Sequence, residues 1–143
     1  MQSSPQYKEV IVEIREFLPK RIDAVEAAGI ARERIVIDPG FGFGKTLKHN
    51  LKLLRCLDQF TDMGMPVLAG LSRKSMLREI TGNKKGGLVS FSVSAALLAA
   101  INGARILRVH DVKATKDALK VYNAVTLSLI HISEPTRRTP ISY

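Results

Sequence analysis

Three short apolar runs, each followed by a segment with helical periodicity, constrain the fold of this chain more than any other feature. The runs are Ile35–Ile37, Pro66–Gly70 and Ile106–Val109. Short continuous apolar runs are typical of strands buried on both faces of a parallel sheet, and their alternation with helices predicts βα units. The sequence therefore predicts an α/β protein with parallel strands, built either as a doubly wound sheet or as part of a (β/α)8 barrel.

The expected helices follow from apolar residues that recur at spacings of three and four. The first of them contains Pro19, which predicts a kink or a division into two short helices. A glycine-rich loop is expected after the first strand, and a second loop over residues 83–87. The helices are expected over residues 7–29, 50–60, 72–81, 89–101 and 113–125.

Composition and charge exclude several classes of protein. The 143 residues carry 22 Lys and Arg against 13 Asp and Glu, a net charge of +9. The basic residues are scattered and do not alternate with aromatic residues, so a charged surface with one anion site is expected rather than a nucleic-acid partner. No apolar run approaches the roughly 18 residues of a membrane span, and no secretory segment is recognised. The single cysteine, Cys56, excludes an intramolecular disulfide, and a reducing, cytoplasmic location is expected.

A polar cluster follows each of the three predicted strands. Asp38 and the glycine loop follow the first, Ser72–Ser75 the second, and the third runs into Arg108–Asp111. In parallel α/β folds the functional residues gather where strands end and helices begin. Three such clusters at one edge of a sheet predict a shared site.

The glycine loop resembles two phosphate-binding motifs but lacks the spacing of both. Pro39 stands where the P-loop needs its first glycine, and Lys45 stands where the dinucleotide fingerprint needs its third. A flexible backbone with two phenylalanines remains, which suits a planar apolar ligand. The alternative is an ordinary turn in which Phe41 and Phe43 pack in a core, and Phe41 is the one expected there.

Taken together, the three clusters resemble dihydropteroate synthase, the folate-pathway enzyme that sulfonamides inhibit. Asp38–Lys45, Ser72–Ser75 and Arg108–Val112 occur in the order and spacing of that family, and the first seven residues resemble the segment that precedes this region. The resemblance covers about residues 1–126. It implies that the chain holds the last three strands of a (β/α)8 barrel and is incomplete. It also implies that the full-length enzyme is a homodimer that uses Mg2+, with the metal ligand in the other half of the barrel and none in this chain.

The resemblance implies a transferase reaction and a set of site residues. The dihydropterin-methyl group passes from 6-hydroxymethyl-7,8-dihydropterin pyrophosphate to 4-aminobenzoate, and pyrophosphate leaves. Asp38 would bind the amino-pyrimidine edge of the pterin, while Lys74 would bind its carbonyl and position the aminobenzoate. Arg108 and His110 would hold the pyrophosphate, and Asp111 would orient a neighbour or cap the following helix. Three further residues are expected to contact the aminobenzoate: Gly42, Phe43 and Ser75.

Three other interpretations remain open at this stage. Another pterin-binding barrel, such as a methyltetrahydrofolate:corrinoid methyltransferase, would lack the pyrophosphate for which Arg108 and His110 are suited. A nucleotide- or nucleic-acid-binding module would use Gly40–Lys45 and the positive charge. A truncated remnant would have lost its chemistry, and this chain alone is expected to be inactive.

Residues 127–143 are expected to form a non-native tail. Residues 127–137 equal the translation of a transposase adaptor used in sequencing libraries, and their apolar pattern departs from the helical periodicity that precedes them. We therefore expect a domain over residues 1–126 and exclude the tail, with His131, from the candidate site.

Overall fold

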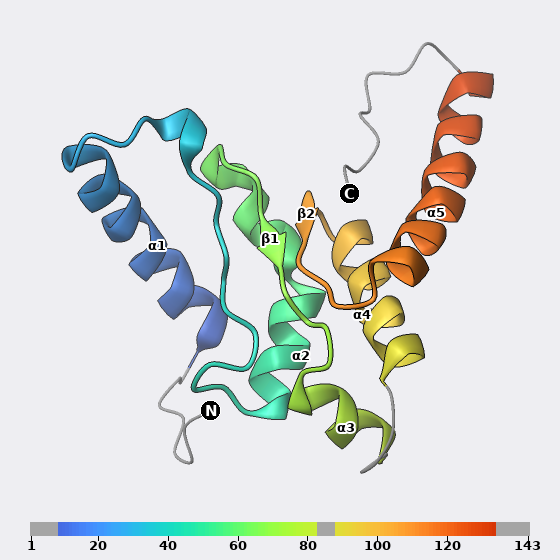
Figure 1. The fold of residues 1–143 in the computed structure, drawn as a ribbon. Helices are drawn as coiled ribbons and strands as arrows, with labels where there is room; N and C mark the ends of the chain where they lie inside the picture. Colours follow the sequence, from blue (N-terminus) through green and yellow to red (C-terminus); the bar gives the residue numbers. More distant parts are fainter. Residues whose placement is uncertain (1–8, 83–87, 134–143) are drawn as a thin grey trace.

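The computed structural model describes residues 9–82 and 88–133. The expected loop at 83–87 and the amino-terminal motif at residues 1–7 lie outside these ranges. Figure 1 shows a small parallel sheet in the middle of the molecule, with α1 and α5 at opposite ends. Within the described ranges, no helix has the length and apolar content that crossing a membrane requires.

The predicted strands are present as a short parallel arrangement. β1 (Leu68–Ala69) pairs in parallel with β2 (Ile106–Leu107), and on the other side of β1 a single parallel bridge joins Ile37 to Val67. The paired segments at Ile37, β1 and β2 are each shorter than the apolar run from which a strand was predicted. Ile37 packs against Ile22 and Met65, whereas 42% of Val36 is exposed. The prediction that this first run is buried on both faces was therefore wrong for the described part of the chain.

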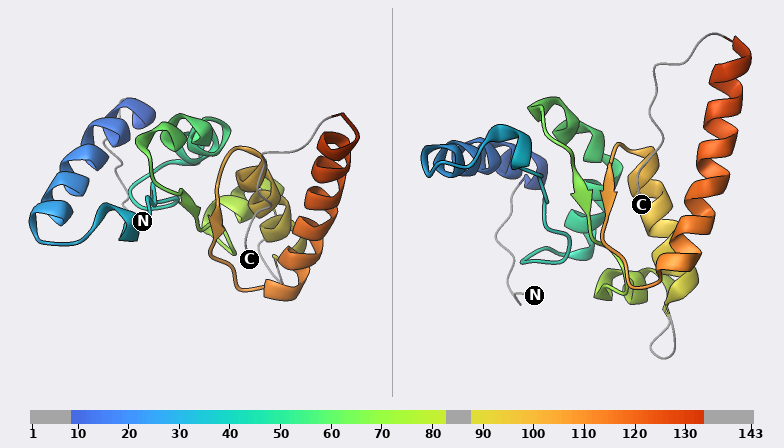
Figure 2. Two further views of the ribbon diagram at one scale, coloured as in Figure 1. Left: turned by 90° about the horizontal axis from the view of Figure 1, so that it is seen from above. Right: turned by 45° about the horizontal axis from the view of Figure 1, so that its top comes forward.

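Along the chain, helices and strands follow one another in the expected order. Figure 2 shows from two sides that β1 and β2 lie side by side, with α2 and α4 beside them. The observed helices are α1 (Val10–Ala27), α2 (Leu47–Arg55), α3 (Ser75–Thr81), α4 (Val89–Ile101) and α5 (Val112–Ser133), with 3-10 segments η1 (Arg32–Arg34) and η2 (Leu57–Met63). Burial of their apolar faces forms one principal core, in which Phe41, Leu53, Leu57 and Phe60 are almost completely inaccessible.

Two helices differ from the expectation for identifiable reasons. α1 continues through Pro19 without a break; the ring lies at an exposed position, where water can bind the carbonyl that loses its helical partner. The segment predicted as one helix over 50–60 instead begins at Leu47 and divides at Cys56. There the amide of Asn102 donates to the Leu54 carbonyl over 2.9 Å, a contact between residues 48 apart that apolar periodicity does not reveal.

The expected end of helical structure near residue 126 was also wrong. α5 continues to Ser133, because extending an existing helix needs no new nucleus and tolerates a weak apolar pattern. The helix carries no information on the origin of residues 127–143, and the assignment of that tail as non-native stays a prediction.

Candidate active site

The three polar clusters leave the sheet at the same edge. Asp38 follows Ile37, Gly70 follows β1 and Arg108 follows β2, and the backbone N–H of Arg108 still donates to the Ala69 carbonyl at 3.0 Å. Because the strands are parallel, their carboxyl ends lie together. The register of the sheet thus brings residues 70 positions apart in the sequence within hydrogen-bond distance.

Asp38 and Arg108 form an ion pair across this edge. The Arg108 guanidinium donates to Asp38 Oδ2 at 3.2 Å, while Asp38 Oδ1 accepts the Gly40 backbone N–H at 2.9 Å. About a third of the Asp38 side chain and just over half of the Arg108 side chain remain exposed. Both groups are therefore accessible to a ligand that offers a better partner.

Arg108, Lys74 and His110 line a cavity of about 190 Å3, together with Gly70, Ser72 and Val109. Gly70 lines this cavity beside the Arg108 guanidinium. A Cβ atom on Gly70 would lie 2.5 Å from an Arg108 guanidinium nitrogen, so the absence of a side chain is what lets the guanidinium rest there. Two cationic side chains and a histidine around one small cavity favour an anion.

Lys74 connects this cavity to the glycine loop. Its ammonium donates to the Phe41 carbonyl at 3.0 Å and lies 4.6 Å from the centre of the Phe43 ring, a cation–π contact. Burial lowers the pKa of Lys74, the positive charge of Arg108 lowers it further, and Asp38 acts in the opposite direction. The amine is thus held between an aromatic surface and a cationic one, in a position to donate to a ligand.

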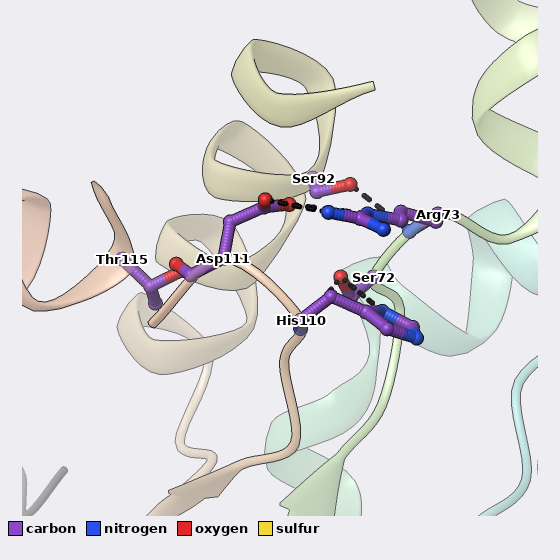
Figure 3. Close-up of polar contacts among 6 residues, drawn as sticks. All are labelled: Ser72, Arg73, Ser92, His110, Asp111 and Thr115. Atoms are coloured by element: carbon purple, nitrogen blue, oxygen red, sulfur yellow. Dashed lines mark hydrogen bonds and ion pairs between the residues drawn. The ribbon is translucent and has the colours of Figure 1, made fainter. Parts of the chain in front are cut away.

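A second set of polar contacts joins the loop after β1 to the loop after β2 (Figure 3). Ser72 Oγ accepts the His110 backbone N–H at 3.1 Å and lies 3.0 Å from His110 Nδ1. Arg73 donates to Asp111 Oδ1 at 2.8 Å, and this hydrogen bond lowers the pKa of the Asp111 carboxyl. These contacts fix His110 relative to the residue that precedes Lys74.

Arg73 adopts a backbone conformation that is unusual for a residue with a side chain. Its φ is +55°, the left-handed region, and among the described residues it alone does so without being glycine. Its N–H donates to Ser92 Oγ in α4 at 2.9 Å, and its side chain reaches Asp111. The contacts at both ends of Arg73 compensate for the strain and turn the chain so that Lys74 faces the cavity.

The remaining residues predicted for the site lie around the glycine loop and the start of α3. Phe43 is 64% exposed and presents its ring to Lys74, whereas Phe41 is 1% exposed and belongs to the core, as expected. Gly42 has φ +91° and a Cβ there would touch the Lys74 side chain at 3.6 Å. Ser75 is exposed in the first turn of α3. Asp38, Gly42, Phe43 and Ser75 do not line the 190 Å3 cavity itself.

Three polar residues that sequence reasoning did not assign to the site support it from behind. Lys45 is 2% exposed and donates to carbonyls of the glycine loop, and Asn50 is 1% exposed and accepts the Gly42 N–H at 2.9 Å. Arg73 is the third. Neither the burial of Lys45 nor the pairing of Arg73 with Asp111 has a signal in the spacing of the sequence.

The described side chains do not fit a metal ion. Within residues 9–82 and 88–133, no three His, Cys, Asp or Glu side chains are grouped so that they could hold one. The Mg2+ that the resemblance implies for the full-length enzyme stays a prediction.

With the fold and this geometry in place, comparison with known proteins defines the class. The family described as pterin binding enzyme matches residues 1–110, which is most of the chain. The chain belongs to that family of pterin-binding enzymes.

More specifically, its relatives are dihydropteroate synthases. The dihydropteroate synthase of Neisseria meningitidis serogroup C is 49% identical over 131 residues, covering 90% of this chain and 46% of that protein. Two structures of the Xanthomonas albilineans enzyme are 50% identical with a TM-score of 0.82. The one with 7,8-dihydropteroate covers 88% of this chain and 48% of that one, and the one with 4-aminobenzoic acid covers 86% and 45%. The chain thus spans about half the length of the relatives it matches.

Proposed function

We propose that this chain forms part of a dihydropteroate synthase, which transfers the dihydropterin-methyl group from its pyrophosphate ester to 4-aminobenzoate. The observation that carries the proposal is the convergence of Asp38, Lys74, Arg108 and His110 at one sheet edge, in a chain about 50% identical to enzymes solved with 7,8-dihydropteroate and with 4-aminobenzoic acid. In this reaction the bond between the methylene carbon and the ester oxygen breaks, the aminobenzoate nitrogen bonds to the carbon and releases a proton, and pyrophosphate departs.

Arg108 and His110 bind the leaving pyrophosphate. A guanidinium offers a planar set of donors that matches phosphate oxygens, and a histidine ring adds a donor when protonated. Both side chains line the cavity with Lys74, so the developing negative charge meets donors that are already oriented. This arrangement favours a pyrophosphate leaving group over the methyl transfer of corrinoid-dependent relatives, which releases no such anion.

Asp38 binds the pterin. A carboxylate matches the paired N–H donors of an amino-pyrimidine edge, and its negative charge stabilises positive charge on the methylene carbon. Because Asp38 pairs with Arg108 when no substrate is bound, substrate binding replaces one ion pair with a pair of hydrogen bonds to the pterin and an ion pair to the pyrophosphate. The pterin edge takes the carboxylate, and the pyrophosphate takes the guanidinium.

The glycine loop and the start of α3 bind the acceptor. The exposed Phe43 ring provides an apolar surface for the benzoate ring, and Lys74, above that ring, can donate to both substrates. Ser75 in the first turn of α3 offers a hydroxyl and a backbone N–H to the carboxylate of the aminobenzoate. Gly42 leaves room beside Lys74 for the approach.

We infer further that the three strands are the last three of a (β/α)8 barrel and that the active enzyme is a cytoplasmic homodimer containing Mg2+. The short strands support an incomplete sheet, since Ile37 and β2 each have only one neighbour among the described residues. On this basis the chain alone does not catalyse the reaction, and the remaining strands of the barrel complete the sheet and the active site.

The test joins residues 1–126 in frame to the amino-terminal half of the Neisseria meningitidis enzyme and measures 7,8-dihydropteroate formation. We expect turnover by the joined protein, none by the chain alone, and a loss of about 10^2- to 10^3-fold in kcat/KM for Arg108→Ala, the range seen when one oriented donor to a developing charge is removed. Turnover by the chain alone would contradict its incompleteness. A folded joined protein without turnover would contradict the proposed function.

A further inference from the structure

Lys45 is a buried charge that the reaction, as derived above, does not use. Only 2% of the residue is exposed, although a lysine is almost never buried without partners. Its burial lowers the pKa of the ammonium, Lys74 lowers it further, and Asp38 partly opposes the change. A residue of this kind is costly to keep in a core, so its contacts indicate what it contributes.

Two of those contacts lie within the glycine loop. The Lys45 ammonium donates to the Gly40 carbonyl at 2.6 Å and to the Phe43 carbonyl at 3.2 Å. Gly40, Gly42 and Gly44 all have positive φ, so the loop turns around the ammonium and directs carbonyl oxygens toward it. The Lys45 ammonium thus acts as an internal cation bound by the loop carbonyls. It makes rigid a loop whose three glycines would otherwise leave the backbone flexible.

The outer side of the same loop bears the candidate acceptor-binding surface. Phe43, whose carbonyl Lys45 holds, is 64% exposed, and its ring lies under the Lys74 ammonium at 4.6 Å. Lys74 in turn donates to the Phe41 carbonyl at 3.0 Å. Two lysines therefore hold this loop, Lys45 from within and Lys74 from the cavity side, and the Phe43 ring lies where their contacts meet.

We propose that Lys45 is a positioning residue for the aromatic acceptor, because its buried ammonium sets the loop shape that presents Phe43 beside Lys74. This inference rests on the proposed function and adds to it a determinant of acceptor affinity. Asp38 precedes the loop and is held by Gly40 and Arg108, so the pterin and pyrophosphate contacts depend less on Lys45.

The kinetic test uses the joined enzyme with Lys45→Met, which keeps the length and apolar stem of the side chain but removes its donors. We expect the KM for 4-aminobenzoate to rise about tenfold, as for the loss of a charge-assisted hydrogen bond, and the KM for the pterin substrate to change less than about threefold. Lys45→Arg should recover part of the affinity. Lys48→Met, at an exposed position of α2, is the matched control and should change neither constant.

A double-substitution cycle separates positioning from a general effect on stability. If Lys45 acts through Phe43, Lys45→Met should raise the KM for 4-aminobenzoate less than about twofold in a Phe43→Ala background. Independent, multiplying effects would overturn the proposal, as would an equal rise in the KM for both substrates. If Lys45→Met does not fold, Lys45→Gln, which keeps an amide donor without the charge, takes its place in the same cycle.

A measurement on the 143-residue chain itself keeps this inference distinct from the proposed function. Lys45→Met should speed amide hydrogen exchange in residues 40–46 while leaving α4 unchanged, and Lys48→Met should not. An inactive joined enzyme whose loop nevertheless loosens in this way would contradict the function and retain the structural role of Lys45. Unchanged exchange in the loop would overturn that role.

Discussion

The two loops that form the candidate site are held in contrasting ways. Most of the hydrogen bonds that hold the glycine loop, residues 39–46, close within eight residues along the chain: Asp38 to Gly40, Lys45 to Gly40, and Asn50 to Gly42. Lys74 adds a long-range contact to the Phe41 carbonyl. The loop after β1 is held by contacts that span 19 and 38 residues, from Arg73 to Ser92 and to Asp111. The first loop is thus stabilised mainly by its own residues and their near neighbours, whereas the second depends on the correct assembly of α4 and β2.

This difference predicts how each loop responds to change. Perturbing the glycine loop should act locally on the aromatic surface, and perturbing the second loop should displace several site residues together. Lys74 belongs to both systems, because it follows Arg73 and donates to the glycine loop. It is therefore the residue whose loss should disturb both loops at once.

Lys74→Ala in the joined enzyme should lower kcat/KM by about 10^2-fold or more, since it removes an oriented donor and the bridge between the loops. Steady-state kinetics with both substrates would measure the effect, with Lys48→Ala as the control for loss of a surface charge. Rates within twofold of those of the unsubstituted enzyme would show that catalysis does not depend on the link that Lys74 makes between the two loops.

Asp111→Asn should lower kcat/KM by about tenfold, because it frees Arg73 and lets Lys74 and His110 shift, and misplacing reacting groups by an ångström costs up to about 10^2-fold. The control is Asp117→Asn, which removes a carboxylate that pairs with Lys113 on the exposed side of α5, the helix that follows Asp111. If both substitutions have the same small effect, the Arg73–Asp111 ion pair is not what positions Lys74 and His110.

The same ion pair gives the Asp111 variant a defined pH dependence. The hydrogen bond from Arg73 holds the pKa of the Asp111 carboxyl below its ordinary value of 3.8. Such a group stabilises the fold above the unfolded-state pKa and loses that contribution as the pH falls through the folded-state value. The Tm difference between the unsubstituted chain and Asp111→Asn should therefore be constant above about pH 5 and shrink below pH 4.

Gly42→Ala should have the smallest effect on the site. Its φ of +91° makes any side chain strained, at a cost of about 1 kcal/mol, yet its Cβ would meet Lys74 only at ordinary contact distance. Urea unfolding should report that loss, and the KM for 4-aminobenzoate should rise about threefold. Gly29→Ala, with φ +100° beyond the end of α1 and no atoms within 4 Å, should lose similar stability without a kinetic effect.

The sequence predicted the parts of this molecule that depend on local pattern. The apolar pattern of residues 89–101 predicted α4 with its observed bounds, and the order of strands and helices was confirmed. The convergence of Asp38 and Arg108 on one edge also followed from parallel strands, without knowledge of a side-chain position. These features could be predicted because periodicity and topology suffice to determine them.

The parts that were missed depend on contacts between distant segments or on burial. Asn102 binds the Leu54 carbonyl next to the point where the helix expected over 50–60 divides, and Asp111 pairs with the left-handed Arg73. Neither partner is adjacent in the sequence. Lys45 resembles a surface lysine until the surrounding carbonyls are known. The substrate-binding roles stay predictions for all seven residues: Asp38, Gly42, Phe43, Lys74, Ser75, Arg108 and His110.

The bare backbone at Gly70 has a consequence for reading variation among related chains. No unusual φ restricts this position, and the three nearest atoms that a methyl group there would meet all belong to the flexible end of the Arg108 side chain. A substitution at Gly70 would thus leave the backbone fold intact but displace the Arg108 guanidinium from its position beside residue 70. Related chains with alanine or serine at the position of Gly70 are expected to have another residue at the position of Arg108, so the two positions should covary.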